Sequence, residues 1–491
     1  METPLVMPRI RPLLLGCTVF LLLALPARPQ PLSGSECDPR THRPLSELLG
    51  CVERYFNVSI SCKRFDPDTV QLAFGAFRMR PYSLDETLDN LLRPLDLVWT
   101  RKTVPATADS ASPESPLPTP LPAATVRITV QPYEYYRRTP ADGARLLQWL
   151  SSLIPDLSAW EQRRSRLLAE ARMALGLEPF LRALVADPDV RLGHRVRHDG
   201  YTTQNYALET LPGLYVCGTI YAPLSSGRHP LIVSPSGHWE GGRCRPDQQL
   251  RMATFARMGA VAVDMDIFGW GDSERQVGRE AHTQDYSMQI QVLWSRAVTD
   301  WILSSRCDID TTRMAATGGS GGATHALLLA LVNDRFTVLA PVVHLVSHFD
   351  GGCPCESGRA VTLAAGGSCM PELLAAVMAP HPTLTVSDGG DWTATYPVLE
   401  YPFLQRIWGL YGATQAVRNV HLAGERHDYG VNKRRAVYAF LAETLGLDPA
   451  QADENRVELL PEAALRSFGD ELPAASVRSR EELEQMLEKL E

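Results

Sequence analysis

The feature that most constrains the fold is a regular alternation of short apolar strands and longer helices between residues 200 and 445. The strand-like runs are Thr202–Leu208, Leu214–Tyr221, Pro230–Ser234, Ala260–Asp264, Met314–Thr317, Val338–Val343, Leu384–Ser387 and Val417–Leu422. Helical patterns lie between several of them, among them Met288–Ser305 and Ala323–Val332. The sequence therefore predicts an α/β fold, a mostly parallel sheet with helices on both faces, and an active site beyond the carboxyl ends of the strands.

A separate small α+β domain is expected at residues 40–131. Its first helix is indicated by apolar residues at helical spacing, Leu45, Leu48, Leu49, Val52 and Phe56. A capping box at Ser83-Leu84-Asp85-Glu86 opens a second helix. Residues 104–124 are dominated by Pro, Ala, Ser and Thr, which favours an extended, solvated segment. It could link two domains, but the alternation at Thr125–Val130 favours an insertion within a hairpin and a domain boundary near Pro132.

Residues 1–27 have the pattern of a signal peptide. Arg9 and Arg11 precede the apolar stretch Leu13–Leu25, which is too short to span a bilayer comfortably. We therefore expect cleavage and an exported protein, either periplasmic or secreted. Cys17 completes a faint lipobox pattern but lies inside the apolar stretch, so we favour cleavage over lipid attachment.

The α/β domain is expected to extend over residues 141–448, beginning with a mainly helical region. Residues 449–491 form a C-terminal tail, in which Leu483 and Leu487 predict a final amphipathic helix. We expect no catalytic residue in the tail.

Composition excludes several classes of function. The formal net charge is -8 and there is no basic run, so we expect no nucleic-acid partner.

Of the ten cysteines, Cys17 falls in the predicted signal peptide, and the odd remainder leaves at least one thiol unpaired. There is no pair of C-x-x-C motifs, and Asp264 and Asp266 are expected to cap helices and loops. We therefore predict no metal site and no cofactor.

The nucleophile is predicted to be Ser320. Gly318-Gly319-Ser320-Gly321-Gly322 fits G-x-S-x-G and falls between an apolar strand and a helix. A tight strand-to-helix turn strains the serine and tolerates only small neighbours, as in a nucleophile elbow. The alternative is a flexible glycine-serine loop, which the flanking strand and helix disfavour.

The base and the acid are predicted downstream of the nucleophile, because in this architecture the order is serine, acid, histidine. His427 follows the last strand and can reach back toward the serine. The penultimate strand is followed by two candidate acids, Asp388 and Asp391. We favour Asp391, because the acid at this position is commonly followed by a proline several residues later, here Pro397.

The oxyanion hole is expected to use the backbone N–H of Gly321 and a second donor from the loop after the strand at Pro230–Ser234. His238 or Trp239 is the natural second donor. Trp239 and Trp270 could also form an apolar or sugar-stacking wall, although core packing explains either residue equally well.

Residues 200–445 resemble the bacterial α/β-hydrolase group often labelled acetyl xylan esterase or prolyl-oligopeptidase-like. The resemblance rests on the strings DIFGWGDSE, GGSGGATH, HFDGGCPCESG, SDGGDWT and ERHDYGVNKR. It implies hydrolysis of carboxylic esters, such as acetyl groups on plant polysaccharides, and it maps the triad onto Ser320, Asp391 and His427. One departure is that glycine flanks the nucleophile on both sides.

The N-terminal domain resembles the short N-terminal domain of secretins and TonB-dependent receptors, on the string YSLDETLDNLLRPLDLVWT. The resemblance implies contact with an envelope protein partner in the periplasm. An unrelated packing module is the alternative.

The predicted function is therefore a serine carboxylic-ester hydrolase that acts on a small-molecule or carbohydrate ester, with acetylated carbohydrates expected. Two alternatives remain open, a serine peptidase for short peptides and a non-catalytic hydrolase-like scaffold in envelope assembly. No blade repeat of the kind that accompanies such peptidases is visible in the sequence.

Overall fold

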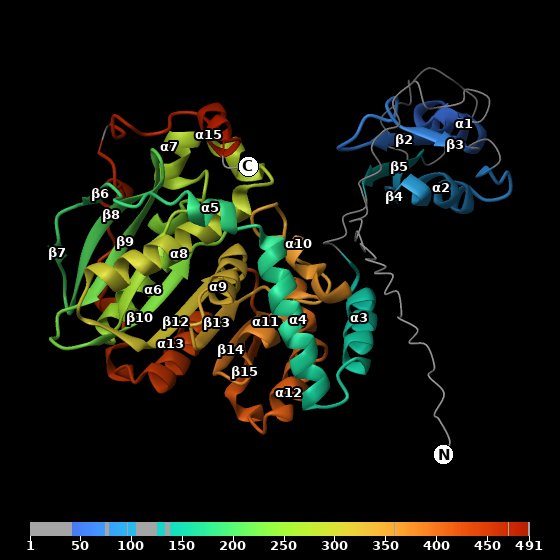
Figure 1. The fold of residues 1–491 in the computed structure, drawn as a ribbon. Coiled ribbons are helices and arrows are strands. Elements are labelled where there is room, and N and C mark those ends of the chain that lie inside the picture. Colours follow the sequence, from blue (N-terminus) through green and yellow to red (C-terminus); the bar gives the residue numbers. More distant parts are fainter. Residues whose placement is uncertain are drawn as a thin grey trace, which may run out of the picture. The chain divides into compact units, whose positions relative to one another are not determined.

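The computed structural model describes residues 42–73, 78–95, 97–104, 125–132, 138–357, 359–469 and 471–489. The chain divides into two compact units, residues 1–134 and residues 135–491 (Figure 1). The predicted signal peptide, the predicted lipobox and residues 105–124 lie outside the described residues. Within the part that is described, no helix has both the length and the apolar character needed to cross a bilayer.

The first unit is a small α+β body. Its elements are β1 (His42–Pro44), α1 (Leu45–Phe56), β2 (Val58–Cys62), β3 (Gln71–Ala73), α2 (Leu84–Leu92), η2 (Arg93–Leu95), β4 (Leu97–Val104) and β5 (Thr125–Pro132). The Ser83 side chain caps α2 by accepting the Glu86 N–H. β5 lies between β2 and β4, parallel to the first and antiparallel to the second. Residues 105–124 therefore connect two neighbouring antiparallel strands.

The second unit is built on a ten-stranded sheet. Its strands are β6 (Val190–Leu192), β7 (Val196–Arg197), β8 (Tyr201–Leu211), β9 (Leu214–Pro223), β10 (His229–Pro235), β11 (Val261–Met265), β12 (Ile309–Gly319), β13 (Val338–Val342), β14 (Thr383–Asp388) and β15 (Val417–Leu422). The order is β15-β14-β13-β12-β10-β11-β9-β8-β6, with β7 paired to β8. The strands from β10 to β15 are mutually parallel, whereas β6 to β9 add antiparallel pairs at the other edge.

Helices cover both faces of this sheet (Figure 1). The helices of this unit are α3 (Pro140–Ser152), α4 (Leu157–Leu175), α5 (Glu178–Arg182), α6 (Pro246–Arg257), α7 (Glu274–Val277), α8 (Ser287–Ser305), α9 (Gly321–Val332), α10 (Arg359–Thr362), α11 (Met370–Met378), α12 (Glu400–Leu410), α13 (Val431–Leu445), α14 (Glu462–Leu465) and α15 (Arg480–Leu487). Side chains alternate between the faces, as the strand period of two requires. Leu231 and Val233 pack on the α8–α9 side, and Ile232 packs on the α6–α13 side. The predicted fold class is confirmed.

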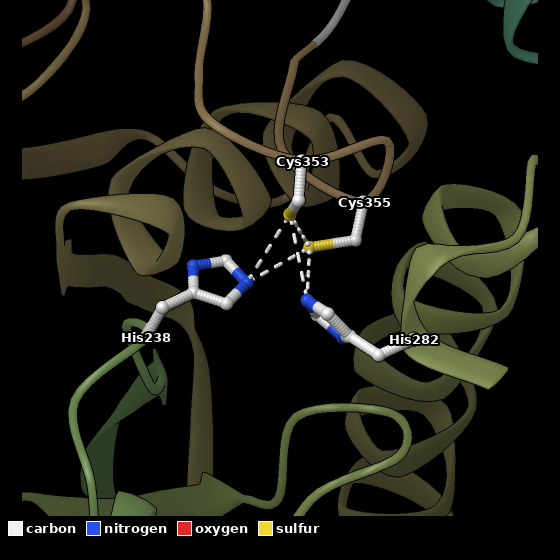
Figure 2. Close-up of side chains that lie close together, drawn as sticks. All are labelled: His238, His282, Cys353 and Cys355. Atoms are coloured by element: carbon white, nitrogen blue, oxygen red, sulfur yellow. Dashed lines mark hydrogen bonds between the residues drawn. The ribbon is translucent and has the colours of Figure 1, made fainter. Parts of the chain in front are cut away.

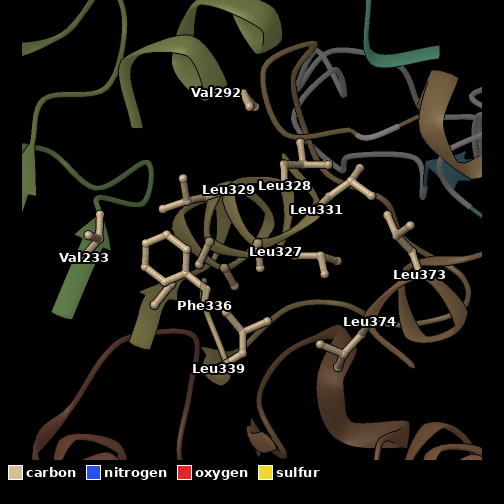
Figure 3. Packing of buried hydrophobic residues seen from close by; sticks show 14 of the residues in the cluster. Val233, Val292, Leu327, Leu328, Leu329, Leu331, Phe336, Leu339, Leu373 and Leu374 are labelled. Atoms are coloured by element: carbon tan, nitrogen blue, oxygen red, sulfur yellow. The ribbon is translucent and has the colours of Figure 1, made fainter. Parts of the chain in front are cut away.

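The larger apolar core lies on the α8–α9 side. Figure 3 shows Leu327, Leu328, Leu329 and Leu331 of α9 surrounded by side chains from β10, β13, α8 and α11. All four leucines are buried, so α9 is apolar around most of its circumference. A helix of this kind belongs to the interior of a large domain, and it begins at the residue after Ser320.

Candidate active site

Ser320 stands in a strained turn at the carboxyl end of the sheet. It follows the last residue of β12 and precedes the first residue of α9. Its φ is 55° and its ψ is -127°, a left-handed backbone conformation that is costly for a residue with a Cβ. The Ser320 N–H donates to the Val342 carbonyl at 2.9 Å, which ties the turn to β13.

The small neighbours of the serine are a steric requirement. A Cβ at Gly318 would collide with the Gly322 carbonyl oxygen, and a Cβ at Gly322 would collide with the Pro235 carbonyl oxygen at the end of β10. Gly318 and Gly322 thus let three backbone segments, β12, the start of α9 and the end of β10, approach one another at the turn.

His427 reaches the serine from the loop between β15 and α13. Its Nε2 lies 3.0 Å from Ser320 Oγ, and its Nδ1 lies 2.6 Å from Asp391 Oδ2. Asp391 also accepts hydrogen bonds at Oδ1 from the Thr393 N–H (2.6 Å) and the Thr393 hydroxyl (2.5 Å). Burial would raise the pKa of Asp391, but hydrogen bonds from His427 and Thr393 outweigh burial and leave that pKa below its ordinary value. The carboxylate therefore stays charged beside the imidazole.

The other candidate acid, Asp388, faces a different partner. Its Oδ2 lies 3.0 Å from Lys433 Nζ, and both side chains are fully buried. Burial raises the pKa of Asp388 despite the nearby ammonium group. Lys433 also donates to the Arg426 carbonyl and to Asp428 Oδ1, at 2.7 and 2.8 Å. Asp388 therefore braces the loop that carries His427, while Asp391 contacts the imidazole.

Two backbone N–H groups lie close to the nucleophile turn. Gly321 is the first residue of α9, where N–H groups have no acceptor within the helix. A Cβ at Gly237 would collide with the Gly319 carbonyl, so the loop after β10 packs against the turn. The Trp239 N–H donates to the Gly237 carbonyl at 2.9 Å, whereas in the described chain the His238 N–H has no acceptor. Of the two predicted second donors, His238 is the one whose N–H is available.

Comparison with solved structures places the chain among esterases. It matches "Methylesterase BT1017" at 46% sequence identity and a TM-score of 0.77, over 91% of this chain and 98% of that one. The chain belongs to the family of methylesterase BT1017. Its fold is accordingly that of an α/β-hydrolase, as the sequence predicted.

Other esterases are more distant from this member of the BT1017 family. A glucuronoyl esterase from Solibacter usitatus is 12% identical, covers 59% of this chain and 94% of its own, and gives a TM-score of 0.42. An acetyl xylan esterase from Paenibacillus sp. R4 is 16% identical, covers 57% of this chain and 99% of its own, and gives a TM-score of 0.37. No family model and no curated protein matches the chain.

In the present chain, two aromatic rings flank the imidazole of His427. The ring centroid of Trp392 lies 4.4 Å from that of His427, and the Trp239 ring lies 5.5 Å from it. Trp392 was not predicted from the sequence, although its position directly after Asp391 could have indicated it. In the described structure Trp270 forms no hydrogen bond and no ring contact with a triad residue. Its ring stacks on the Arg279 guanidinium at 3.3 Å and lies 5.8 Å from the His238 ring.

A cluster of two histidines and two cysteines adjoins the site, at odds with our expectation of no metal site. His238, His282, Cys353 and Cys355 point their side chains toward a common centre (Figure 2). The sequence contains the signal in Cys353-Pro354-Cys355, but His238 and His282 lie far upstream and meet the cysteines only through the fold. These four residues, hereafter the His/Cys cluster, have a metal-ligating donor set.

A second group of possible metal ligands consists of Cys217, Asp266 and Asp272. Its two carboxylates are already paired with an arginine side chain. The buried Arg243 binds Asp266 Oδ1 at 2.8 Å and Asp272 Oδ2 at 2.9 Å. Asp264 accepts the Thr219 N–H at 2.9 Å. These carboxylates organise buried loops and strands.

Proposed function

We propose that this chain hydrolyses carboxylic esters by two-step acyl transfer to Ser320. The observation that carries the proposal is the continuous path from Ser320 Oγ through His427 to Asp391, with separations of 3.0 and 2.6 Å. A serine hydroxyl becomes an effective nucleophile when a base within hydrogen-bond reach removes its proton. Membership of an esterase family supports the same reaction class.

In the first step, His427 takes the Ser320 proton as Oγ attacks the ester carbonyl carbon. The imidazolium that forms is stabilised by the ionised Asp391, which also fixes the proton on Nδ1. The negative charge on the carbonyl oxygen is received by the N–H groups of Gly321 and His238. The tetrahedral intermediate then collapses, and His427 gives its proton to the departing alcohol.

In the second step, water hydrolyses the acyl-enzyme. His427 removes a proton from the water, whose oxygen attacks the acyl carbon, and the same N–H groups stabilise the second intermediate. Collapse returns the proton to Ser320 Oγ and releases the carboxylic acid. The residues named here suffice for both proton transfers.

For the substrate, we propose methyl esters of carbohydrate acids, in place of the acetylated carbohydrates expected from the sequence. The support is the 46% identity to a methylesterase over nearly the whole of that chain. The two esters differ in which part of the substrate becomes attached to Ser320. A methyl ester places the sugar on the acyl side and releases methanol. An acetyl ester leaves only a small acyl group on the serine. The rings of Trp239 and Trp392 beside His427 offer apolar surface to a sugar ring.

The test compares three substrate types on one enzyme preparation: a methyl-esterified oligosaccharide acid, an acetylated oligosaccharide and short peptides. We expect kcat/KM for methanol release to exceed that for acetate release by about tenfold or more, a difference of about 1.4 kcal/mol in transition-state binding. Faster acetate release would restore the acetyl-ester prediction, and peptide cleavage as the fastest reaction would favour the peptidase alternative.

The Ser320→Ala variant tests the nucleophile. We expect turnover to fall by a factor on the order of 10^4 or more, because the variant lacks the nucleophile while its fold is unchanged. A fluorophosphonate probe should label the wild type and leave Ser320→Ala unlabelled. Absence of labelling in a folded wild type would instead support the non-catalytic scaffold.

We also propose that the protein is exported and that its first unit contacts an envelope protein. The sequence patterns of residues 1–27 and of the secretin-like string support this assignment. Fractionation of the host should find the full chain in the periplasm or the medium, and a chain lacking residues 1–27 in the cytoplasm. Retention of the full chain in the cytoplasm would contradict the proposal.

A further inference from the structure

We propose that the His/Cys cluster binds one zinc ion, and that this ion holds the oxyanion loop against the nucleophile turn. The first half of the proposal concerns metal binding alone. The second half rests on the proposed esterase function.

The donor atoms lie at, or somewhat inside, the separations that a tetrahedral ion imposes. His238 Nε2 lies 3.0 Å from Cys355 Sγ and 3.5 Å from Cys353 Sγ, and His282 Nε2 lies 3.5 and 3.4 Å from the same two atoms. With Zn–S bonds of about 2.3 Å and Zn–N bonds of about 2.0 Å, neighbouring ligand atoms stand roughly 3.3–3.8 Å apart. Binding the ion would therefore require the two closest pairs, His238 Nε2–Cys355 Sγ and Cys353 Sγ–Cys355 Sγ, to move apart by about 0.5–0.7 Å, while the other pairs already fit.

The two sulfur atoms are placed as two separate thiolate ligands. Cys353 Sγ and Cys355 Sγ are 3.1 Å apart, well beyond the S–S bond of about 2.05 Å, and both cysteines are free. Two imidazoles and two thiolates form the Cys2His2 set of structural zinc sites. With four protein ligands the site is closed, so its expected role is structural.

A hydrogen bond behind the His282 ring and a carboxylate behind the His238 ring aim Nε2 of each ring at the centre. His282 Nδ1 lies 2.8 Å from the Phe268 carbonyl, which can only accept, so the proton is on Nδ1 and the Nε2 lone pair faces the cysteines. His238 Nδ1 lies 3.2 Å from Glu356 Oε2, which orients that ring in the same way. Metal-binding histidines commonly donate their other ring N–H to a carboxylate or a carbonyl.

The site would tie together three loops at the active-site edge of the sheet. His238 follows β10, His282 lies in the short helix Arg279–Thr283, and both cysteines lie in the segment after β13. Cys355 is fully buried and His282 is 6% exposed. Once bound, the ion would restrict the motion of all three loops relative to the sheet.

The link to catalysis runs through His238. Its backbone N–H is the proposed oxyanion donor, while its side chain belongs to the cluster. A Cβ at Gly321 would lie 2.6 Å from His238 Nδ1 and would collide with Glu356 Oε2, so this pair packs directly against the other proposed donor. His238 and Glu356 are thus positioning residues that set the distance between the two N–H groups.

The direct test is the metal content of the full chain, purified through a tag that binds no metal. Elemental analysis should find about one zinc per chain in the wild type. The variants Cys353→Ser, Cys355→Ser and His282→Gln should each lose most of it. Cys307→Ser, an exposed cysteine outside the cluster, and Ser320→Ala should keep it. A wild type without zinc, or with stoichiometric iron or copper instead, would overturn the proposal.

Cobalt substitution provides a readout that does not depend on folding of the variants. Cobalt exchanged into the wild type should produce intense visible bands of a tetrahedral ion and a thiolate charge-transfer band in the near ultraviolet. Mass analysis after alkylation should show two protected thiols. A Cys353–Cys355 disulfide in the native protein would overturn the proposal.

Kinetics separates the metal site from the esterase proposal. Glu356→Gln should weaken zinc affinity by roughly 10–100-fold. Partial zinc removal should lower kcat with KM little changed, because the oxyanion donors act mainly in the transition state. If the wild type holds zinc but hydrolyses no ester, only the proposed function fails. If activity is unaffected by zinc removal, the positioning role fails.

Discussion

At the scale of single residues, the neighbouring carboxylates of Asp388 and Asp391 have different roles in the site. Asp391 is hydrogen-bonded to the imidazole, while Asp388 forms a fully buried ion pair with Lys433. The sequence narrowed the candidates for the triad acid to these two residues, but it could not predict that Asp388 contacts Lys433. That contact depends on the first turn of α13 folding back over the end of β14. The later proline, Pro397, favoured Asp391, the residue that lies behind the ring.

The pair Asp391→Asn and Asp388→Asn tests this division. Asp391→Asn should lower kcat by a factor on the order of 10^3–10^4, because the amide leaves the imidazole in the wrong tautomer and its cation unsupported. Asp388→Asn should instead lower the free energy of unfolding by about 1–3 kcal/mol, because it removes the fully buried one of the carboxylates that face Lys433 and leaves the more exposed Asp428 and Glu425. Steady-state kinetics and urea denaturation measure the two effects, and a larger kcat loss in Asp388→Asn would reverse the assignment.

At the scale of elements, periodicity predicted the strands and helices well because burial on both faces leaves long apolar runs. The strand predicted at Pro230–Ser234 is β10, and the helix predicted at Ala323–Val332 is most of α9. The same periodic patterns could not predict which side chains distant in the sequence meet in the fold. His238 was selected for its backbone N–H, but the partners of its side chain come from a loop more than one hundred residues away. No local periodicity encodes such a meeting.

The turn into α9 offers a prediction about close backbone approach. Gly322→Ala should reduce stability by about 1–3 kcal/mol and sharply reduce activity, because the new methyl group would push α9 away from the end of β10. Gly424→Ala is the matched control, since a Cβ there meets nothing within 4 Å. Thermal denaturation and ester turnover should separate the two variants, and equal behaviour would contradict the proposed crowding.

At the scale of the whole second unit, the C-terminal tail packs back on the hydrolase body. The Val477 N–H donates to the Gly213 carbonyl at 2.9 Å, and the Ser467 N–H donates to Asp272 Oδ2 at 2.7 Å. Phe468 is buried against Tyr215 of β9. The tail thus packs against the antiparallel strands β8 and β9 and the turn between them, a role that its composition alone did not indicate.

A substitution of Leu483 in α15 tests how much the packing of the C-terminal tail contributes to stability. It is fully buried in the larger core, so Leu483→Ala should lower the free energy of unfolding by about 2–5 kcal/mol. Leu459→Ala removes the same atoms from a side chain that is 47% exposed and should cost much less. Chemical denaturation of the two variants tests the difference, and equal losses would mean that the tail packs loosely.

Stability of the unit should also depend on acid through Glu400, a buried carboxylate at the start of α12. It accepts the Ser347 N–H at 3.1 Å and the Ser347 hydroxyl at 2.7 Å, and it lies 3.7 Å from His348 Nδ1. Burial would raise the pKa of Glu400, but the nearby His348 ring and the hydrogen bonds from Ser347 outweigh burial and hold that pKa below its ordinary value. A depressed pKa means that the unfolded chain binds this proton first as pH falls.

The stabilisation from Glu400 is therefore fully present above the pKa of an unfolded glutamate, about 4.3, and is lost as pH falls below it toward the folded value. Glu400→Gln should cost about 1–3 kcal/mol at neutral pH, and the gap to the wild type should narrow on acidification. Glu443→Gln is the matched control, because Glu443 forms an exposed pair with Arg418 whose effect on stability should be small at any pH. Urea denaturation between pH 3 and pH 7 measures the gap. A gap for Glu400→Gln that stays constant over this range would show that the carboxylate is not held in its charged form by the contacts with Ser347 and His348.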